Sequence, residues 1–324
     1  MFEVIHSSRF DKSTELKPPP ILPGDRIGIV APGSAPSDPD RLRQGIERLD
    51  GLGFEIEMDP PEIESVGYLA GSDEDRAAAF NRMVARKDVK ALFCVRGGYG
   101  CLRILPLIDY NAARANPKLL VGYSDVTALH LALYERSGWY GLQGPMVAVE
   151  WPDIDPHIEE LFWDLATGGG TGLLEGPSGE RLTGIRSGTV DGTLLGGNLT
   201  MITALIGTPY LPSLDRAILY VEDVDEAPYR IDGQLAKLQL SGILGRLGGL
   251  IFGGFSGWEP KSDKPTLSYE DVMAHYAQFV HGPVAGNLQF GHFPAKNTMP
   301  VGIQASLDVI DHQVELVFKE RITS

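Results

Sequence analysis

Short apolar runs alternate with amphipathic stretches through the first half of the chain. Apolar runs typical of buried strands lie at residues 25–31, 54–58, 91–95 and 119–122. Apolar residues recur with helical spacing at residues 38–52 and 72–86. An alternation of strand and helix predicts a parallel sheet covered on both faces. Active sites in such sheets lie at the carboxyl ends of the strands, where we expect Pro32-Gly-Ser34, Arg96-Gly-Gly-Tyr-Gly100 and Ser124.

The second half of the chain has a more mixed pattern. Polar, glycine-rich sequence at 167–187 is typical of a linker, so we expect an N-terminal domain over 1–166 and a C-terminal domain over 188–324. The C-terminal pattern predicts helices at 197–206 and 269–280, and strands at 217–221, at 249–252 and from 301 onward. The predicted class is α/β, a parallel-sheet Rossmann-like domain followed by a smaller, mixed and strand-rich domain.

Composition limits the partners and the location of this protein. The chain has 324 residues, is 43% hydrophobic and carries a formal net charge of −15. Such a negative charge repels nucleic acid and anionic membranes, so we expect neither as a partner. Its start lacks a basic region followed by an apolar stretch, and nowhere do about 18 apolar residues run together. These features predict a cytoplasmic protein.

Ser124 is the first candidate for chemistry. The apolar run at 118–122 stops just before it, and a helix-like pattern begins at once. A serine on a sharp turn from strand to helix presents its hydroxyl to a substrate, while the following N–H groups face the atom attacked. The alternative is a helix N-cap, the more common role for a serine judged on this segment alone.

The glycine cluster at 96–100 invites a nucleotide-binding interpretation. The third glycine of G-x-G-x-x-G is absent, however, and the chain has no G-x-x-x-x-G-K-[ST] motif. Dinucleotide binding is therefore disfavoured. Glycines in this position also let backbone N–H groups approach a developing oxyanion closely.

A hydroxyl nucleophile needs a base and a carboxylate that orients the base. Among seven histidines, His292 stands in a polar, proline-bearing loop, whereas His130 and His275 fit helix faces and a packing role. Glu222 directly follows an apolar strand, which would fix its position. The acids after it, Asp223, Asp225 and Glu226, would be solvated or would bind Ca²⁺ or Mg²⁺, although no EF-hand spacing is present. The two cysteines, Cys94 and Cys101, match no zinc or redox spacing.

Several blocks of sequence occur together in one order. They are Arg96-Gly-Gly-Tyr-Gly100, Gly122-Tyr-Ser-Asp125, Gly144-Pro-Met146, Gly196-Gly-Asn198, Glu222-Asp-Val with Pro228-Tyr-Arg-Ile-Asp232, and Gly291-His292 followed by Asn297 and Pro300. With these blocks the chain resembles the LD-carboxypeptidase family of serine peptidases over 24–302. That family includes murein tetrapeptide carboxypeptidases and microcin C immunity peptidases.

The resemblance implies a catalytic triad of Ser124, Glu222 and His292 at the interface of the two domains. It also implies an oxyanion hole formed by the N–H of Asp125 with that of Gly98 or Gly97. The implied substrate is a peptide ending in a D-amino acid, as in murein tetrapeptide, and the implied assembly is a homodimer. Neither a metal nor another cofactor is needed. Arg96, Arg103 and Arg230 are candidates for binding the substrate's terminal carboxylate, and the cleft would also be lined by Tyr99, Asn198 and Glu226.

Two other functions stay open. A branch of the same family hydrolyses aminoacyl-nucleotide amides, which requires stacking partners for an adenine ring. Trp258 is a candidate, but its loop is short and carries no further aromatic cluster. A non-catalytic binding protein for a small ligand could share the fold. Against it stand all three triad residues, each in its matching context.

Overall fold

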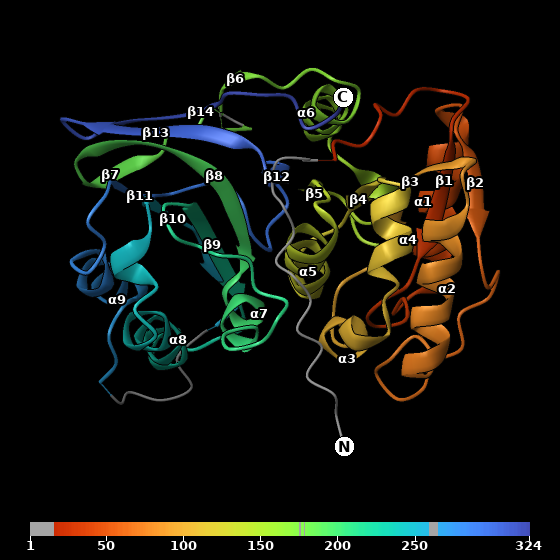
Figure 1. Cartoon of the computed structure of the whole chain (residues 1–324), viewed down its shortest axis with the longest axis horizontal. Helices are drawn as coiled ribbons and strands as arrows, with labels where there is room; N and C mark the ends of the chain where they lie inside the picture. The colour runs from red at the N-terminus through yellow and green to blue at the C-terminus, as the bar shows by residue number, and fades with distance from the viewer. Residues whose placement is uncertain (1–15, 175, 178, 259–264) are drawn as a thin grey trace.

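A computed structural model describes residues 16–174, 176–177, 179–258 and 265–324. Residues 1–15, on which the expected absence of a leader rests in part, lie outside the described residues. The chain forms two sheets in two halves that lie side by side (Figure 1). No helix in the described ranges combines the length and the apolar character needed to cross a membrane.

The N-terminal half contains a six-stranded sheet in the order β12-β5-β4-β3-β1-β2. Its strands are β1 (Arg26–Val30), β2 (Glu55–Met58), β3 (Val89–Cys94), β4 (Leu119–Val121), β5 (Gly141–Gln143) and β12 (Met299–Val301). The helices of this half are α1 (Pro39–Gly51), α2 (Asp73–Ala85), α3 (Cys101–Ile104), α4 (Tyr110–Ala115), α5 (Thr127–Ser137) and α6 (Pro156–Ala166). Strands β1 to β5 are parallel to one another, which confirms the predicted α/β pattern. One edge strand that the sequence did not indicate, β12, pairs antiparallel with β5.

The C-terminal half contains an eight-stranded sheet in the order β6-β14-β13-β8-β9-β10-β11-β7. Its strands are β6 (Gly172–Leu173), β7 (Thr183–Arg186), β8 (Gly188–Asn198), β9 (Ile218–Val224), β10 (Gly249–Ser256), β11 (Val284–Gly286), β13 (Gln304–Ile310) and β14 (Gln313–Phe318). The helices are α7 (Leu199–Ala204), α8 (Pro228–Leu240) and α9 (Tyr269–Ala277). Strands β8 to β11 are parallel, so this half also has carboxyl strand ends along one edge.

Part of the stretch predicted as a linker belongs to the second sheet. Strand β6 pairs with β14, and β7 pairs with β11. Both strands are short and largely exposed, so their hydrophobic pattern is weak. Conversely, β12 from the C-terminal half joins the first sheet. The chain therefore crosses between the halves more often than a single linker would require.

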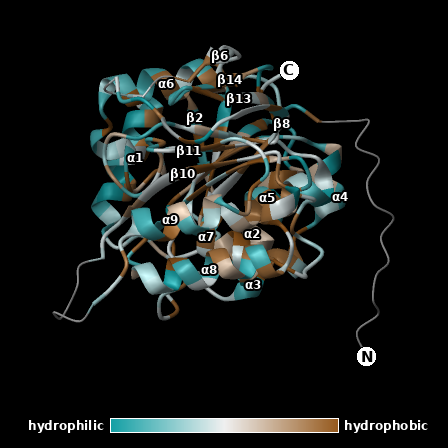
Figure 2. Ribbon diagram, turned by 90° about the vertical axis from the view of Figure 1, so that its left-hand side faces the viewer, coloured by the Kyte–Doolittle hydropathy of each residue, from teal (hydrophilic) through white to brown (hydrophobic). Residues whose placement is uncertain are grey.

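Helix α5, which directly follows Ser124, lies between the two halves (Figure 1) and contacts β5, β8 and β12. Nearly all of its side chains are buried, and Figure 2 shows it as largely hydrophobic, unlike the outer helices. A helix that is apolar all round is stable only when it is surrounded by protein. His130 on this helix is buried as well, with Nε2 2.7 Å from the Gly122 carbonyl oxygen. Its packing role is confirmed.

Candidate active site

The carboxyl ends of parallel strands from both sheets carry the predicted chemistry. In the first sheet these ends lead into the loops that hold Ser34, Gly97 and Ser124. In the second sheet they carry Asn198 at the end of β8, Glu222 in β9, and the loop after β11 that holds His292. This location agrees with the general position of active sites in such sheets.

Ser124 has the backbone conformation of a sharp turn. Its φ is 66°, a left-handed value that is strained for a residue with a side chain. It follows β4 and begins the 3-10 helix Ser124–Val126, which leads into α5. In the described chain its hydroxyl makes no capping hydrogen bond, and the residue is partly exposed. The hydroxyl therefore remains available to a substrate, and the N-cap alternative is not what the structure has.

The glycine loop packs directly against this turn. A Cβ on Gly97 would lie 2.9 Å from the Ser124 Cβ and 3.2 Å from its Oγ. Gly98 has a φ of 94°, and a Cβ there would lie 2.4 Å from the Ser34 Oγ. Ser34, in the loop after β1, holds the glycine loop in place. Its N–H donates to the Gly97 carbonyl (3.1 Å), and its Oγ accepts from the Tyr99 N–H (3.1 Å). Only glycine fits at both positions.

The Asp125 side chain joins the nucleophile turn to the end of the glycine loop. Its carboxylate accepts a hydrogen bond from the Cys101 N–H at 2.9 Å. The side chain is 2% exposed, and burial raises the pKa of its carboxyl. Asp125 thus fixes the spacing between the two backbone segments that were predicted to form an oxyanion hole.

Glu222 and His292 form a hydrogen-bonded pair. The His292 Nδ1 lies 2.8 Å from the Glu222 Oε2, and the Glu222 side chain is fully buried, whereas that of His292 is 20% exposed. A carboxylate accepts hydrogen bonds only, so we assign the Nδ1–H tautomer to His292. Its Nε2 is then free to take a proton. The Tyr123 and His292 rings are 5.1 Å apart between centroids, which brings the histidine next to the residue before Ser124.

Asn198 supports Glu222 from the neighbouring strand. The two residues are register partners in the parallel pair β8 and β9. The Asn198 Nδ2 donates to the Glu222 Oε1 at 3.3 Å and to the Asp223 Oδ1 at 2.9 Å. Asn198 thus lies behind the acid, where it orients Glu222. The sequence alone suggested only that it lines the cleft.

The acidic run at the end of β9 divides into a buried residue, Asp223, and residues nearer the surface. Asp223 is 3% exposed and accepts hydrogen bonds from the Thr200 N–H (3.0 Å) and Oγ1 (2.8 Å), and burial raises the pKa of its carboxyl. Glu226 pairs with Arg230 at 3.4 Å. Within the described residues, no group of three or more histidine, cysteine or acidic side chains could hold a metal ion.

The three candidate arginines differ in their partners. Arg103 forms an ion pair with Asp73 at 2.8 Å, and the 60% exposed Arg230 pairs with Glu226. Arg96 adjoins Gly97, is partly buried, and has no carboxylate partner among the described residues. Tyr99 is 45% exposed and meets Tyr68 edge-on, with ring centroids 5.4 Å apart. Arg96 is therefore the cation of the three that is left for a ligand.

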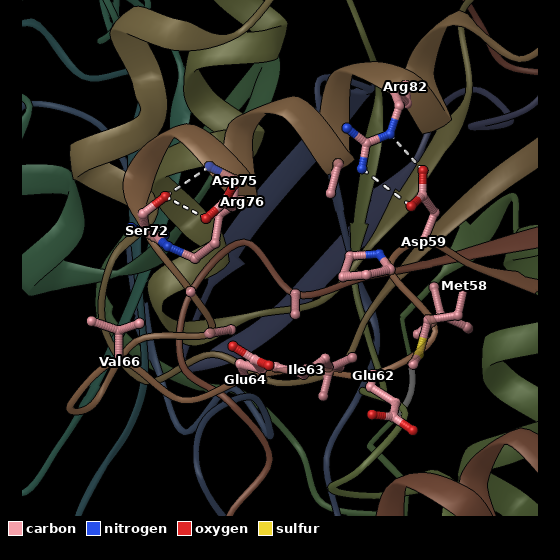
Figure 3. Close-up of a pocket in the computed structure, with 17 residues that line it drawn as sticks. Met58, Asp59, Glu62, Ile63, Glu64, Val66, Ser72, Asp75, Arg76 and Arg82 are labelled. Atoms are coloured by element: carbon pink, nitrogen blue, oxygen red, sulfur yellow. Dashed lines mark hydrogen bonds and ion pairs between the residues drawn. The ribbon is translucent and has the colours of Figure 1, made fainter.

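Two of the pockets in the described structure bear on the position of the site. One, of about 670 Å³, is lined by Tyr123, Glu150, His292 and Lys296 among others, and so adjoins the candidate site. The other, of about 410 Å³, lies between α2 and the segment after β2 (Figure 3). Its rim carries the Arg82–Asp59 ion pair, and none of the predicted site residues lines it.

Comparison with known proteins places this arrangement among peptidases. The model of the LD-carboxypeptidase N-terminal domain matches residues 27–144, and that of the C-terminal domain matches residues 191–307. The crystal structure of a muramoyltetrapeptide carboxypeptidase from Oxalobacter formigenes is 30% identical, with a TM-score of 0.79, and the match covers 90% of this chain and 98% of that one. The α/β architecture is thus that of a class of hydrolases.

Sequence relatives agree with this class. A Bacillus subtilis protein named "Probable murein peptide carboxypeptidase" is 32% identical over 301 residues, 92% of this chain and 93% of that protein. The microcin C7 self-immunity protein of Escherichia coli is 25% identical and covers 92% of this chain and 94% of its own length. The chain belongs to the LD-carboxypeptidase family, and it is a peptidase.

Proposed function

We propose that this protein is a serine LD-carboxypeptidase that releases the C-terminal D-alanine from murein tetrapeptide. The observation that carries the proposal is the 2.8 Å hydrogen bond between the fully buried Glu222 and His292, whose ring lies 5.1 Å from that of Tyr123, the residue before the strained Ser124 turn. A buried carboxylate bonded to Nδ1 holds an imidazole in the tautomer that accepts a proton at Nε2.

In the proposed acylation step, the Ser124 Oγ attacks the carbonyl carbon of the scissile amide as His292 Nε2 takes its proton. Glu222 stabilises the imidazolium that forms. The oxyanion accepts hydrogen bonds from the backbone N–H of Asp125 and from that of Gly98 or Gly97, which lie on the two segments tied together by the Asp125 carboxylate. His292 then gives its proton to the leaving amine of D-alanine, and the C–N bond breaks.

Deacylation repeats these roles with water. His292 removes a proton from a water molecule, whose oxygen attacks the acyl carbon of the Ser124 ester. The proton then passes to Ser124 Oγ as the ester bond breaks, and the shortened peptide leaves. Apart from the substrate and this water molecule, no step needs a group from outside the protein.

Arg96 is our candidate for binding the terminal carboxylate of the substrate. It follows β3 next to Gly97 and lacks an acidic partner in the described structure, unlike Arg103 and Arg230. A guanidinium can bind a carboxylate through two parallel hydrogen bonds. Replacement of Arg96 by methionine should raise KM more than it lowers kcat, and amidation of the substrate's carboxyl group should abolish the difference between wild type and variant.

The test is release of free D-alanine from L-Ala-γ-D-Glu-meso-diaminopimelate-D-Ala by wild type, Ser124→Ala and, as a matched control, the exposed Ser187→Ala. We expect release by wild type and the control only. If wild type releases no D-alanine but cleaves an aminoacyl-sulfamoyl adenosine, the protein belongs to the aminoacyl-nucleotide branch. Binding of either compound without cleavage would favour a non-catalytic role.

Assembly and location belong to the same proposal. The family resemblance leads us to propose a cytoplasmic homodimer. Light scattering of the purified protein would give the mass of the particle, and cell fractionation would locate it. A monomeric mass would refute the dimer without affecting the proposed reaction.

A further inference from the structure

Lys296 is a buried cation in the loop that carries His292. Its side chain is only 8% exposed, although a lysine ordinarily keeps its ammonium group in water. No motif in the sequence pointed to it. A buried charge is expensive unless it is paired, so its partners indicate what it does.

Both partners of Lys296 come from the N-terminal half. The Lys296 Nζ donates to the Glu150 Oε1 at 2.6 Å and to the Tyr123 hydroxyl oxygen at 2.8 Å. The Tyr123 hydroxyl in turn donates to the same Glu150 oxygen at 2.8 Å. The remaining Glu150 oxygen accepts from the Met146 N–H at 2.8 Å. We call Lys296, Glu150 and Tyr123 the ionic clasp.

The ionic clasp reaches the candidate triad from both sides. Tyr123 directly precedes Ser124, and its ring lies 5.1 Å from that of His292. Lys296 follows His292 by four residues, and its Nζ lies 4.2 Å from the centroid of the Tyr123 ring. The base-bearing loop is thus fastened at one point to the segment that carries the nucleophile.

Backbone hydrogen bonds also hold the base of this loop, and the strand that follows it, β12, pairs with β5 of the first sheet. The Gly254 N–H donates to the Phe290 carbonyl at 2.8 Å, and the Asn297 N–H donates to the Gln289 carbonyl at 2.6 Å. Neither of these two hydrogen bonds involves the N-terminal half. The ionic clasp adds a side-chain tie within the loop itself, between His292 and β12, and this tie lies next to Tyr123 and Ser124.

The charges in the ionic clasp are already balanced. Glu150 is 13% exposed, and Tyr123 stays protonated because burial and the Glu150 charge hold its pKa well above the ordinary value. Lys296 is therefore poorly suited to bind a substrate carboxylate, since it would have to leave a buried partner. Its contacts instead indicate a positioning role.

We propose that Lys296, through Glu150 and Tyr123, is a positioning residue that holds His292 at reacting distance from Ser124 across the interface of the two halves. This inference rests on the proposed function, in which His292 is the base. A misplacement of about 1 Å in such a site costs about 100-fold in rate.

The test uses an alkyl fluorophosphonate, which reports on Ser124 without a peptide substrate. The Ser124 Oγ forms a bond to phosphorus, the P–F bond breaks, fluoride leaves, and His292 takes the serine proton. Labelling of the full-length protein is followed by mass spectrometry, with Ser124→Ala as the blank. The variants are Lys296→Met, Glu150→Gln and Tyr123→Phe, and the matched control is Lys319→Met, a half-exposed lysine paired with Asp191.

We expect Lys296→Met to slow labelling by about 100-fold and Tyr123→Phe by about tenfold, with the control unchanged. The double variant Lys296→Met/Glu150→Gln should be no slower than Lys296→Met, because the two residues act as one unit. With the peptide substrate, kcat should fall while KM stays within about twofold. If Lys296→Met or Glu150→Gln lowers the melting temperature, the conclusion rests on Tyr123→Phe, because this variant removes only the hydroxyl and keeps the packed ring.

Labelling of Lys296→Met at the wild-type rate would overturn the inference. A raised KM with unchanged labelling would do so too, because Lys296 would then contact the substrate. If wild type is labelled but releases no D-alanine, the proposed function fails while the positioning role is still measured. If wild type is not labelled at Ser124, both fail, since no activated serine exists.

Discussion

Replacement of Glu222 by glutamine tests the candidate triad most directly, because it removes a charge and leaves the shape of the side chain. Glu222 presents one oxygen to the His292 Nδ1–H and the other to the Asn198 Nδ2–H. Glutamine has a single acceptor oxygen, so one of these two donors must face an NH₂ group. Either His292 changes tautomer, or a buried Asn198 donor loses its partner.

The expected loss is large for catalysis and small for folding. A triad histidine held in the wrong tautomer loses about 10³ to 10⁴ in kcat, equivalent to about 4 to 5.5 kcal/mol of transition-state stabilisation. A buried polar group left unpaired costs about 1 to 3 kcal/mol of unfolding free energy. We therefore expect Glu222→Gln to stay folded at 25 °C with almost no turnover.

The assay compares kcat/KM for D-alanine release with the urea midpoint of unfolding. Glu315→Gln is the matched control, since Glu315 is exposed on β14 in the same half of the protein. Turnover of Glu222→Gln within threefold of wild type, with an unchanged urea midpoint, would refute the assignment of Glu222. A loss of turnover that is fully explained by a lower urea midpoint would instead indicate that Glu222 is only a structural carboxylate.

Further measurements probe the glycine loop, the buried histidine and the absence of a cofactor from the proposed steps. Gly97→Ala should lower turnover at least tenfold, because its Cβ would lie 2.9 Å from that of Ser124, whereas Gly51→Ala, with nothing within 4 Å, should leave turnover unchanged. Burial lowers the pKa of His130 from 6.5 to about 4, so its stabilising contribution is complete above pH 6.5 and is lost as the pH falls through about 4. The unfolding free energy should fall by at most about 3 kcal/mol over that range, and urea titrations should show a flatter pH dependence for His130→Gln; equal slopes would contradict this. Dialysis against EDTA should leave D-alanine release unchanged, and loss restored by Mg²⁺ or Zn²⁺ would disprove the proposed steps.

The fold of the first half and the strained turn that carries the candidate nucleophile could be predicted because both depend on local patterns. Short apolar runs and helical spacing are set by neighbours in the chain, so β1 to β4, α1 and α2 fall within a few residues of their expected ranges. The turn at Ser124 follows from a strand that stops before a helix begins. Glu222 and His292 could be singled out in the same way, one at the end of a strand and one in a polar loop.

The tertiary structure alone determined the contacts between residues that are far apart in the chain. Pairing of β12 with β5, and of β6 and β7 with the second sheet, depends on partners more than 90 residues away, which leave no periodic pattern in so few residues. Asn198 reaches Glu222 because two strands pair in a particular register. In the sequence Lys296 resembles an ordinary surface lysine. Only the packing of the two halves buries it against Glu150. Periodicity along a chain specifies which face of an element is apolar. Only packing decides which charged side chains are buried, and a buried charge is stable only when it is paired.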